Sequence, residues 1–214
     1  MKVEGIIFDL DGTLVHTIED IGDAANILFK RHGYPEYTSK DFIKWIGSGA
    51  AKFIEQGIGS VIDKAHLKDY VREFKEIYGA NLTVKTTIYD GVAEMLNELV
   101  KRNIKISILS NKPHQLTLGV VENLLSAWNF DPVFGQRDEV PRKPDPAAAI
   151  EIMEMIKISP EKILFVGDSE GDIRTGEAAG MIPVGVSWGY GKMDLANQNG
   201  HSVIDHPEEL LKLL

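Results

Sequence analysis

Short apolar runs alternate with helical patterns along most of this chain, and this alternation limits the fold more than any other feature. Runs that resemble buried strands occupy residues 5–10, 104–109, 163–166 and 182–186, with a weaker run at 132–134. Between them, apolar residues recur at helical spacing. Strands that alternate with helices of this length require right-handed crossovers and a parallel sheet covered on both faces. The sequence therefore predicts an α/β fold with a Rossmann-like, three-layer core around a parallel sheet.

One long segment interrupts the alternation. From Thr17 to about Ala80 the sequence contains helical patterns and no convincing strand. This segment leaves the core after the first strand and returns near residues 81–87, so the two crossings of the chain could act as a hinge. We expect a core of residues 1–15 and 84–214 with an inserted, all-helical cap domain of residues 16–83.

The composition agrees with this organisation and excludes several kinds of site and several classes of protein. A chain of 214 residues, 43% of them hydrophobic, suffices for a core domain that carries a smaller one. It contains no Cys, which excludes disulfides, thiolate catalysis and Cys-based metal centres. No stretch approaches the ~20 apolar residues of a membrane span, and no basic region precedes an apolar run at the N-terminus. We expect a cytoplasmic protein with no membrane partner.

The formal charge of −9 argues against a nucleic-acid partner, because phosphate backbones are held chiefly by Lys and Arg. A small anionic substrate is compatible with this charge only if the site holds a local cation. The oligomeric state stays open between a monomer and a homodimer.

Two acids follow the first predicted strand. Asp9 and Asp11 point the same way if strand geometry persists that far, and like charges so close need a shared proton or a cation. In open parallel sheets, ligands bind at this end of the strands. Gly12 permits a tight turn there, although Asp-Gly is also a common turn dipeptide without function.

A second acidic cluster follows the strand at 163–166. Gly167 precedes Asp168 and Asp172, although Asp168 or Ser169 could equally cap the following helix. Two parallel strands that both end in carboxylates form an oxygen-rich pocket, which suits a hard cation such as Mg²⁺. Because magnesium commonly shares its shell with a phosphate, we expect a phosphate site.

Two further strand ends supply complementary groups. Ser110 and Asn111 precede Pro113, which would start a helix, so a hydroxyl and free N–H groups could cradle an anion. A helix cap is the commoner role for an isolated Ser. Lys143 lies in a Pro-rich turn and is the most plausible fixed positive charge, with Arg142 as its competitor.

These four stretches, in this order, resemble the haloacid dehalogenase superfamily of phosphotransferases. The matches are "DLDGTL" at residues 9–14, "SN" at 110–111, "KP" at 143–144 and "GDSEGD" at 167–172. The second acid, Asp11, separates the chain from the hydrolytic dehalogenases of that superfamily.

The resemblance implies a role for each matched residue. Asp9 would be the nucleophile that forms an aspartyl-phosphate, and Asp11 would protonate the leaving alcohol and then deprotonate water. Lys143 would neutralise charge on the nucleophile and the phosphoryl group. The remaining roles are those of Thr13, which would support the turn, Ser110, which would bind phosphate together with Asn111, and the Mg²⁺ ligands Asp9, Asp168, the backbone carbonyl of Asp11 and, directly or through water, Asp172.

The insertion resembles the family's cap, a lid that excludes water and gives specificity. Its "WIGSGA" stretch at residues 45–50 resembles a cap sequence of phosphoglycolate phosphatases, although a plain loop explains it equally well. Backbone N–H groups from Gly47, Ser48 and Gly49 could bind a small carboxylate. His16 and Thr17 depart from the Asp-Ser or Asp-Thr that relatives often carry at this exit.

The leading hypothesis is an enzyme, a Mg²⁺-dependent phosphatase of a small phosphorylated metabolite, 2-phosphoglycolate first. An inorganic pyrophosphatase and a sugar-phosphate mutase share the same core and remain alternatives. A phosphate-sensing protein without turnover is the alternative outside catalysis, since fold alone does not establish function.

Overall fold

The structure is a computed structural model that describes residues 2–59 and 64–214. Its strands are β1 (Gly5–Phe8), β2 (Val15–His16), β3 (Thr87–Ile88), β4 (Lys105–Pro113), β5 (Val133–Gln136), β6 (Ile163–Gly167), β7 (Ile182–Val186) and β8 (Ser202–Ile204). Its α-helices are α1 (Ile18–Arg31), α2 (Ser39–Trp45), α3 (Ala50–Ile58), α4 (Lys64–Ala80), α5 (Val92–Lys101), α6 (His114–Leu124), α7 (Ala147–Ile156), α8 (Glu170–Ala178) and α9 (Asp194–Gln198), with short 3₁₀ helices η1 (Pro160–Lys162) and η2 (Pro207–Lys212).

In the described part of the chain, six strands form one sheet in the order β5-β4-β1-β6-β7-β8, and every pairing is parallel. β1 lies inside the sheet between β4 and β6, where Gly5 pairs with both Lys105 and Ile163. The predicted α/β fold class is therefore confirmed. β8 was not predicted, because its three residues are too few for a period to be recognised.

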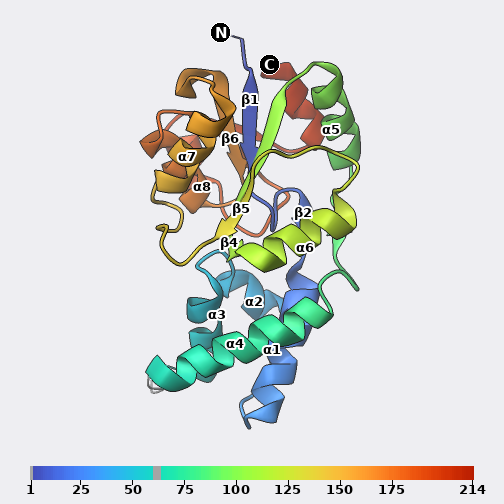
Figure 1. The fold of residues 1–214 in the computed structure, drawn as a ribbon, viewed down its shortest axis with the longest axis vertical. Helices are drawn as coiled ribbons and strands as arrows, with labels where there is room; N and C mark the ends of the chain where they lie inside the picture. The colour runs from blue at the N-terminus through green and yellow to red at the C-terminus, as the bar shows by residue number, and fades with distance from the viewer. Residues whose placement is uncertain (1, 60–63) are drawn as a thin grey trace.

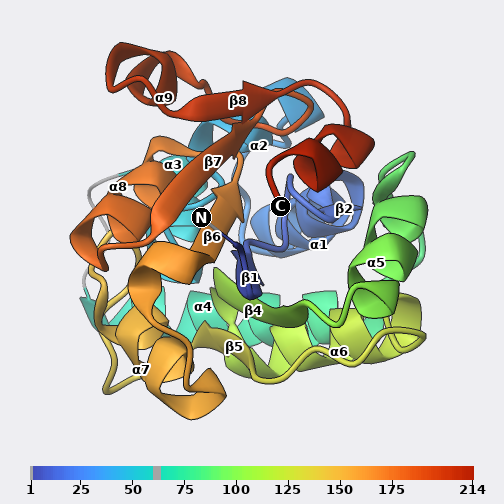
Figure 2. The same ribbon diagram turned by 90° about the horizontal axis from the view of Figure 1, so that it is seen from above.

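Side chains of β1 alternate between two apolar clusters, one on each face of the sheet. Ile6 and Phe8 pack with residues of α5, α6 and η2, whereas Ile7 packs with residues of α7. Figure 2 shows α5 and α6 on one side of the sheet and α7 and α8 on the other. The predicted three layers follow from this alternation, because a strand buried on both faces must be apolar throughout.

Helices α1 to α4 lie together at the end of the core to which β1 leads, away from both termini (Figure 1). They have their own apolar cluster, which contains Phe29, Phe42, Phe53 and Phe74. Between Thr17 and Ala80 the described residues contain helices and no strand, as the sequence predicts. None of the helices described here is long and apolar enough to span a membrane.

The two crossings between these helices and the sheet pair with each other, which the sequence analysis did not foresee. β2 and β3 form an antiparallel ribbon in which Val15 pairs with Ile88 and His16 with Thr87. The carboxylate of the buried Asp20 in α1 accepts hydrogen bonds from the returning chain, among them the backbone N–H and the hydroxyl of Thr86 at 2.8 and 2.7 Å. We call β2 and β3 the hinge ribbon.

Candidate active site

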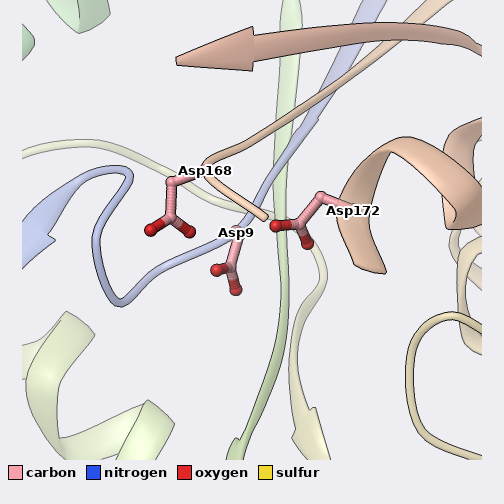
Figure 3. A group of neighbouring side chains, drawn as sticks. All are labelled: Asp9, Asp168 and Asp172. Carbon is pink, nitrogen blue, oxygen red and sulfur yellow. The ribbon is translucent and has the colours of Figure 1, made fainter. Parts of the chain in front are cut away.

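Three carboxylates converge at the ends of adjacent strands. Asp9 follows β1, Asp168 follows β6, and Asp172 lies in the first turn of α8. β1 ends at Phe8, earlier than the predicted strand, and the turn beyond it is set by Gly12, whose φ is +89°. One oxygen from each of Asp9, Asp168 and Asp172 lies within 4.8 Å of the others, and all three residues are buried. Figure 3 shows the three carboxylates around a common space.

Lys143 supplies the fixed positive charge that the sequence analysis assigned to it. Its Nζ donates to Asp9 Oδ1 at 2.7 Å, to Asp172 Oδ1 at 2.6 Å and to the Leu109 carbonyl at 2.8 Å. Burial by itself would lower the pKa of Lys143, but the charges of Asp172 and Asp9 outweigh burial and raise that pKa. Lys143 therefore stays charged beside the nucleophile candidate. The competing Arg142 donates instead to the Ser48 carbonyl in the inserted helical segment, helices α1 to α4 and the loops between them, which we call the cap.

The acids themselves are held in an environment that penalises their negative charge. Burial, opposed in part by Lys143 and reinforced by Asp172 and Asp168, raises the pKa of Asp9 to about 8. Burial and the charge of Asp172 raise the pKa of Asp168 to about 7. Each of these two carboxylates therefore lacks sufficient counter-charge within the protein, which is the condition that a bound cation would relieve.

The remaining oxygens of Asp168 and Asp172 are held by backbone and helix-cap contacts. Asp168 Oδ2 accepts the backbone N–H groups of Tyr190 at 2.6 Å and Gly191 at 3.2 Å. Asp172 Oδ2 accepts both the N–H and the hydroxyl of Ser169, which caps α8 in a capping box. Ser169 thus has the capping role that the sequence analysis considered, and Asp168 points into the acidic cluster.

Asp11 lies apart from this cluster and has other partners. Its Oδ1 accepts the hydroxyl of Thr17 at 2.8 Å, and Nζ of Lys112 lies 2.9 and 3.1 Å from its two oxygens. The side chain of Lys112 is only 2% exposed, so this ion pair is shielded from solvent. Asp9 and Asp11 therefore each face a different lysine.

The two polar residues after β4's apolar stretch have different surroundings. Ser110 is buried beside the site and its Oγ accepts the N–H of Lys112 at 3.2 Å. The Asn111 amide exchanges hydrogen bonds with the backbone of Lys143 at 3.0 and 3.1 Å and donates to the Gly47 carbonyl at 2.8 Å. Ser110 is placed for a ligand, whereas Asn111 joins the Lys143 loop to the cap.

The cap loop, residues 46–49, lies directly over the core. Besides the Asn111 contact with Gly47, the guanidinium of Arg142 donates from Nη1 to the Ser48 carbonyl at 2.7 Å. The backbone of Gly49 has φ of +86°, and a side chain there would overlap Arg142 Nη1. Gly47, Ser48 and Gly49 border the same cavity as the acids.

Of the predicted site residues, Thr13 and Asp172 do not border this cavity in the described part of the chain, and Asp172 lies behind it in the acidic cluster. The hydroxyl of Thr13 is buried and has no hydrogen-bond partner among the described residues, while its carbonyl accepts the indole N–H of Trp188 at 3.1 Å. Thr13 therefore belongs to the turn that follows β1, in line with the supporting role that the resemblance implies.

A cavity of about 550 Å³ separates the core acids from the cap helices. Its floor carries Asp9, Asp11, Ser110, Lys112 and Lys143. The cap contributes mainly apolar side chains, namely Ile21, Ile43, Ile46, Phe53, Phe74 and Tyr78. The volume falls within the usual range of small-molecule sites, roughly 300–1,000 Å³.

Lys112 and Tyr190 are site residues to which the sequence analysis gave no role. A signal existed for Lys112, because it lies two positions after Ser110 on an extended strand and so shares its face. The signal for Tyr190 was weaker: it follows the predicted strand at 182–186, where an aromatic side chain could equally be a packing residue, and its contact with Asp168 arises only in the folded chain.

Comparison with known proteins identifies the family of this chain. Residues 6–186 match the family described as Haloacid dehalogenase-like hydrolase. The chain belongs to this family. It is 31% identical over 209 residues to the phosphoglycolate phosphatase of Aquifex aeolicus (strain VF5), with 98% of this chain and 95% of that protein covered. The phosphoglycolate phosphatase of Haemophilus influenzae is 30% identical, with 97% and 96% covered.

Solved structures of the haloacid dehalogenase-like family confirm the fold over the whole chain. The crystal structure of a predicted phosphoglycolate phosphatase from Haemophilus somnus 129pt has a TM-score of 0.87 at 27% identity and covers 100% of this chain and 98% of its own. The predicted resemblance and the predicted class of hydrolase are confirmed by these relatives.

Proposed function

We propose that this protein is a Mg²⁺-dependent phosphatase that hydrolyses a small phosphomonoester through an aspartyl-phosphate on Asp9. The observation that carries the proposal is the convergence of Asp9, Asp168 and Lys143 on one buried point, although these residues are far apart in the sequence. In this proposal residues 16–83 form the cap and residues 1–15 and 84–214 form the catalytic core.

The donor set fits a hard divalent cation. The ligands would be carboxylate oxygens of Asp9 and Asp168 and the backbone carbonyl of Asp11, and such oxygen ligands favour Mg²⁺ over softer metals. Both oxygens of Asp172 already accept hydrogen bonds from Lys143 or Ser169, which favours a contact from Asp172 through water. When bound, the ion would neutralise charge on the phosphoryl group and on the carboxylates.

The residues of the chain divide the reaction into two displacements. Asp9 attacks phosphorus with a carboxylate oxygen while the bond to the leaving oxygen breaks, and Asp11 gives that oxygen its proton so that the alcohol departs. Water then attacks the phosphorus of the aspartyl-phosphate and gives a proton to Asp11, and the bond between phosphorus and the Asp9 oxygen breaks. Lys143 stabilises the negative charge in both steps, and Ser110 binds a phosphate oxygen.

We propose 2-phosphoglycolate as the substrate. The curated relatives with this activity in their names match nearly the full length of the chain. The cavity lies under Gly47, Ser48 and Gly49, whose N–H groups and the N-terminus of α3 are available to the carboxylate of a small acid. Specificity would then come from the cap and chemistry from the core.

The decisive test is the Asp9→Asn variant. Wild-type protein with Mg²⁺ should release phosphate from 2-phosphoglycolate faster than from other phosphorylated metabolites. Because the amide cannot act as the nucleophile, Asp9→Asn should lower kcat by at least ~10³-fold, which phosphate-release kinetics measure directly. Unchanged turnover in Asp9→Asn would refute the assignment of the nucleophile.

A reaction in water labelled with an oxygen isotope distinguishes a phosphatase from a sugar-phosphate mutase. In the proposed reaction one oxygen from water enters each released phosphate. A mutase would return the phosphoryl group to the substrate without this incorporation, and a phosphate-sensing protein would show no turnover at all.

A further inference from the structure

Lys112 is a buried cation for which the reaction above has no use. It belongs to β4, its side chain is 2% exposed, and its Nζ contacts both oxygens of Asp11 at 2.9 and 3.1 Å. A charged side chain this deeply buried is costly unless it is paired, and here the pair is with the proton-transfer residue itself. Lys112 also borders the cavity in which the substrate would lie.

The charge balance of the site shows that Lys112 is not surplus. The acids of the site are Asp9, Asp11, Asp168 and Asp172, and the buried lysines beside them are Lys112 and Lys143. After Asp11 has given its proton to the leaving oxygen and is ionised, two lysines and one divalent cation match four carboxylates. Without Lys112 the ionised Asp11 would have no cationic side chain paired with it among the described residues.

The cap contacts Lys112 through an aromatic ring. Nζ of Lys112 lies 4.6 Å from the centroid of Tyr78, a residue of the cap helix α4 that is 1% exposed. A cation over an aromatic face is attracted to it, the more so when water is excluded. The Tyr78 hydroxyl is buried and has no hydrogen-bond partner among the described residues, so the ring and not the hydroxyl makes this contact.

Asp11 is therefore held from two directions. Thr17, at the start of the cap, donates its hydroxyl to Oδ1, and Lys112, on the core sheet, contacts both oxygens. The ring of Tyr78 in turn limits where the Lys112 ammonium can lie. The cap thus reaches the proton-transfer residue through two chains of contact, one direct and one through Lys112.

We propose that Lys112 is a positioning residue that orients the Asp11 carboxyl for proton transfer, and that the cap residue Tyr78 keeps Lys112 in place. This inference rests on the proposed function, in which Asp11 gives a proton to the leaving oxygen and later takes one from water. Lys112 does not take part in either bond change. Its loss leaves the nucleophile Asp9 and its partner Lys143 in place.

The test compares two leaving groups in single-turnover experiments on the full-length protein with Mg²⁺. Lys112→Met removes the charge while keeping a long side chain. It should slow alcohol release from 2-phosphoglycolate, which needs a proton, by about 10²-fold, and nitrophenol release from p-nitrophenyl phosphate, which needs little protonation, much less. Equal slowing with both esters would overturn the proposal, because it would show a general structural effect.

A double-mutant cycle decides whether Lys112 acts through Asp11. In the Asp11→Asn background, Lys112→Met should cause no further slowing of alcohol release, because the group it orients is already lost. Multiplicative effects of the two substitutions would overturn the proposal. Lys105→Met is the matched control, since Lys105 lies on the same strand and donates to the Ile156 carbonyl away from the site.

Variants of Tyr78 test the role of the cap without changing any charge. Tyr78→Leu should slow alcohol release several-fold, whereas Tyr78→Phe, which keeps a ring over the ammonium, should retain a rate closer to wild type. Equal rates in Tyr78→Leu and the wild type would overturn the cap's part in the proposal. A wild-type protein that releases no phosphate, or an active Asp9→Asn variant, would instead refute the proposed function itself.

Discussion

At the scale of single residues, Tyr190 connects the acidic cluster to the hinge. Its backbone N–H donates to Asp168, while its hydroxyl accepts the N–H groups of Thr17 at 2.7 Å and Ile18 at 3.2 Å. Those two N–H groups belong to the N-terminus of α1, which has no side-chain cap of its own. A tyrosine distant in sequence therefore takes the place of a local helix cap.

Tyr190→Phe should destabilise the protein by about 1 kcal/mol, because it leaves the N–H groups at the start of α1 without their acceptor. Urea unfolding monitored by circular dichroism measures this change. Tyr89→Phe is a suitable comparison, since the hydrogen bonds described for the Tyr89 hydroxyl are to the side chains of His16 and Tyr190 and not to the N–H groups of α1. A Tyr190→Phe protein as stable as the wild type would contradict the capping role.

The sequence predicted those site residues that lie in a recognisable local pattern along the chain. Asp9 and Asp168 follow apolar strands, and Lys143 lies in a turn of characteristic composition, so local pattern and the family resemblance sufficed. The partners Lys112 and Tyr190 depend on distances across the fold. No periodicity encodes that Lys112 will meet Asp11 or that the Tyr190 hydroxyl will meet α1, because those contacts arise only when strands and loops assemble.

At the scale of elements, the cap loop and two core loops form one assembly. Asn111 and Arg142 hold the carbonyls of Gly47 and Ser48, and Asn111 also fixes the backbone of Lys143. Contact between the cap and the core therefore also bears on the position of the lysine beside the nucleophile.

Gly49→Ala should weaken this assembly in two ways. The new methyl group would displace the Arg142 guanidinium from the Ser48 carbonyl, and an L side chain at φ of +86° costs roughly 1–2 kcal/mol. We expect a several-fold rise in KM with a smaller change in kcat, measured by steady-state kinetics. Gly33→Ala is the matched control, because Gly33 has φ of +76° and open space around it.

Arg142→Gln separates the two causes, since it removes the guanidinium contact without straining the backbone of Gly49. If Gly49→Ala and Arg142→Gln both kept the wild-type KM, the contact between cap loop and core would have no part in substrate binding.

Element prediction failed where elements are short. The hinge ribbon has two residues in each strand, and β8 has three, so neither gives a recognisable alternation. The pairing of Val15 with Ile88 is set by the closure of the whole helical insertion, a distance of more than seventy residues along the chain. By contrast, β6 and β7 were predicted from continuous apolar runs that only a buried strand explains.

At the scale of the whole molecule, the buried acids couple stability to pH and to metal. Burial raises the pKa of Asp9 from 3.8 to about 8 and that of Asp168 from 3.8 to about 7. In the metal-free protein the folded state therefore binds more protons than the unfolded chain between these values, and its stability should fall as the pH rises from about 4 to about 8.

Mg²⁺ should counter this loss, because it binds the deprotonated carboxylates and stabilises the folded state in proportion to its occupancy. The rise in Tm on adding millimolar Mg²⁺ should therefore be larger near pH 8 than near pH 5, as differential scanning calorimetry would measure. Asp168→Asn should reduce this difference. A rise in Tm that is the same at both pH values would contradict the account of the acidic cluster.

The hinge ribbon has a consequence for how the two halves of the molecule move. Because the outgoing and returning strands are paired side by side, we expect the two connections between cap and core to move together and not independently. The main motion expected of the cap is then a rotation about the hinge ribbon. Substrate entry, product exit and changes in the contacts over the nucleophile would then accompany the same rotation of the cap.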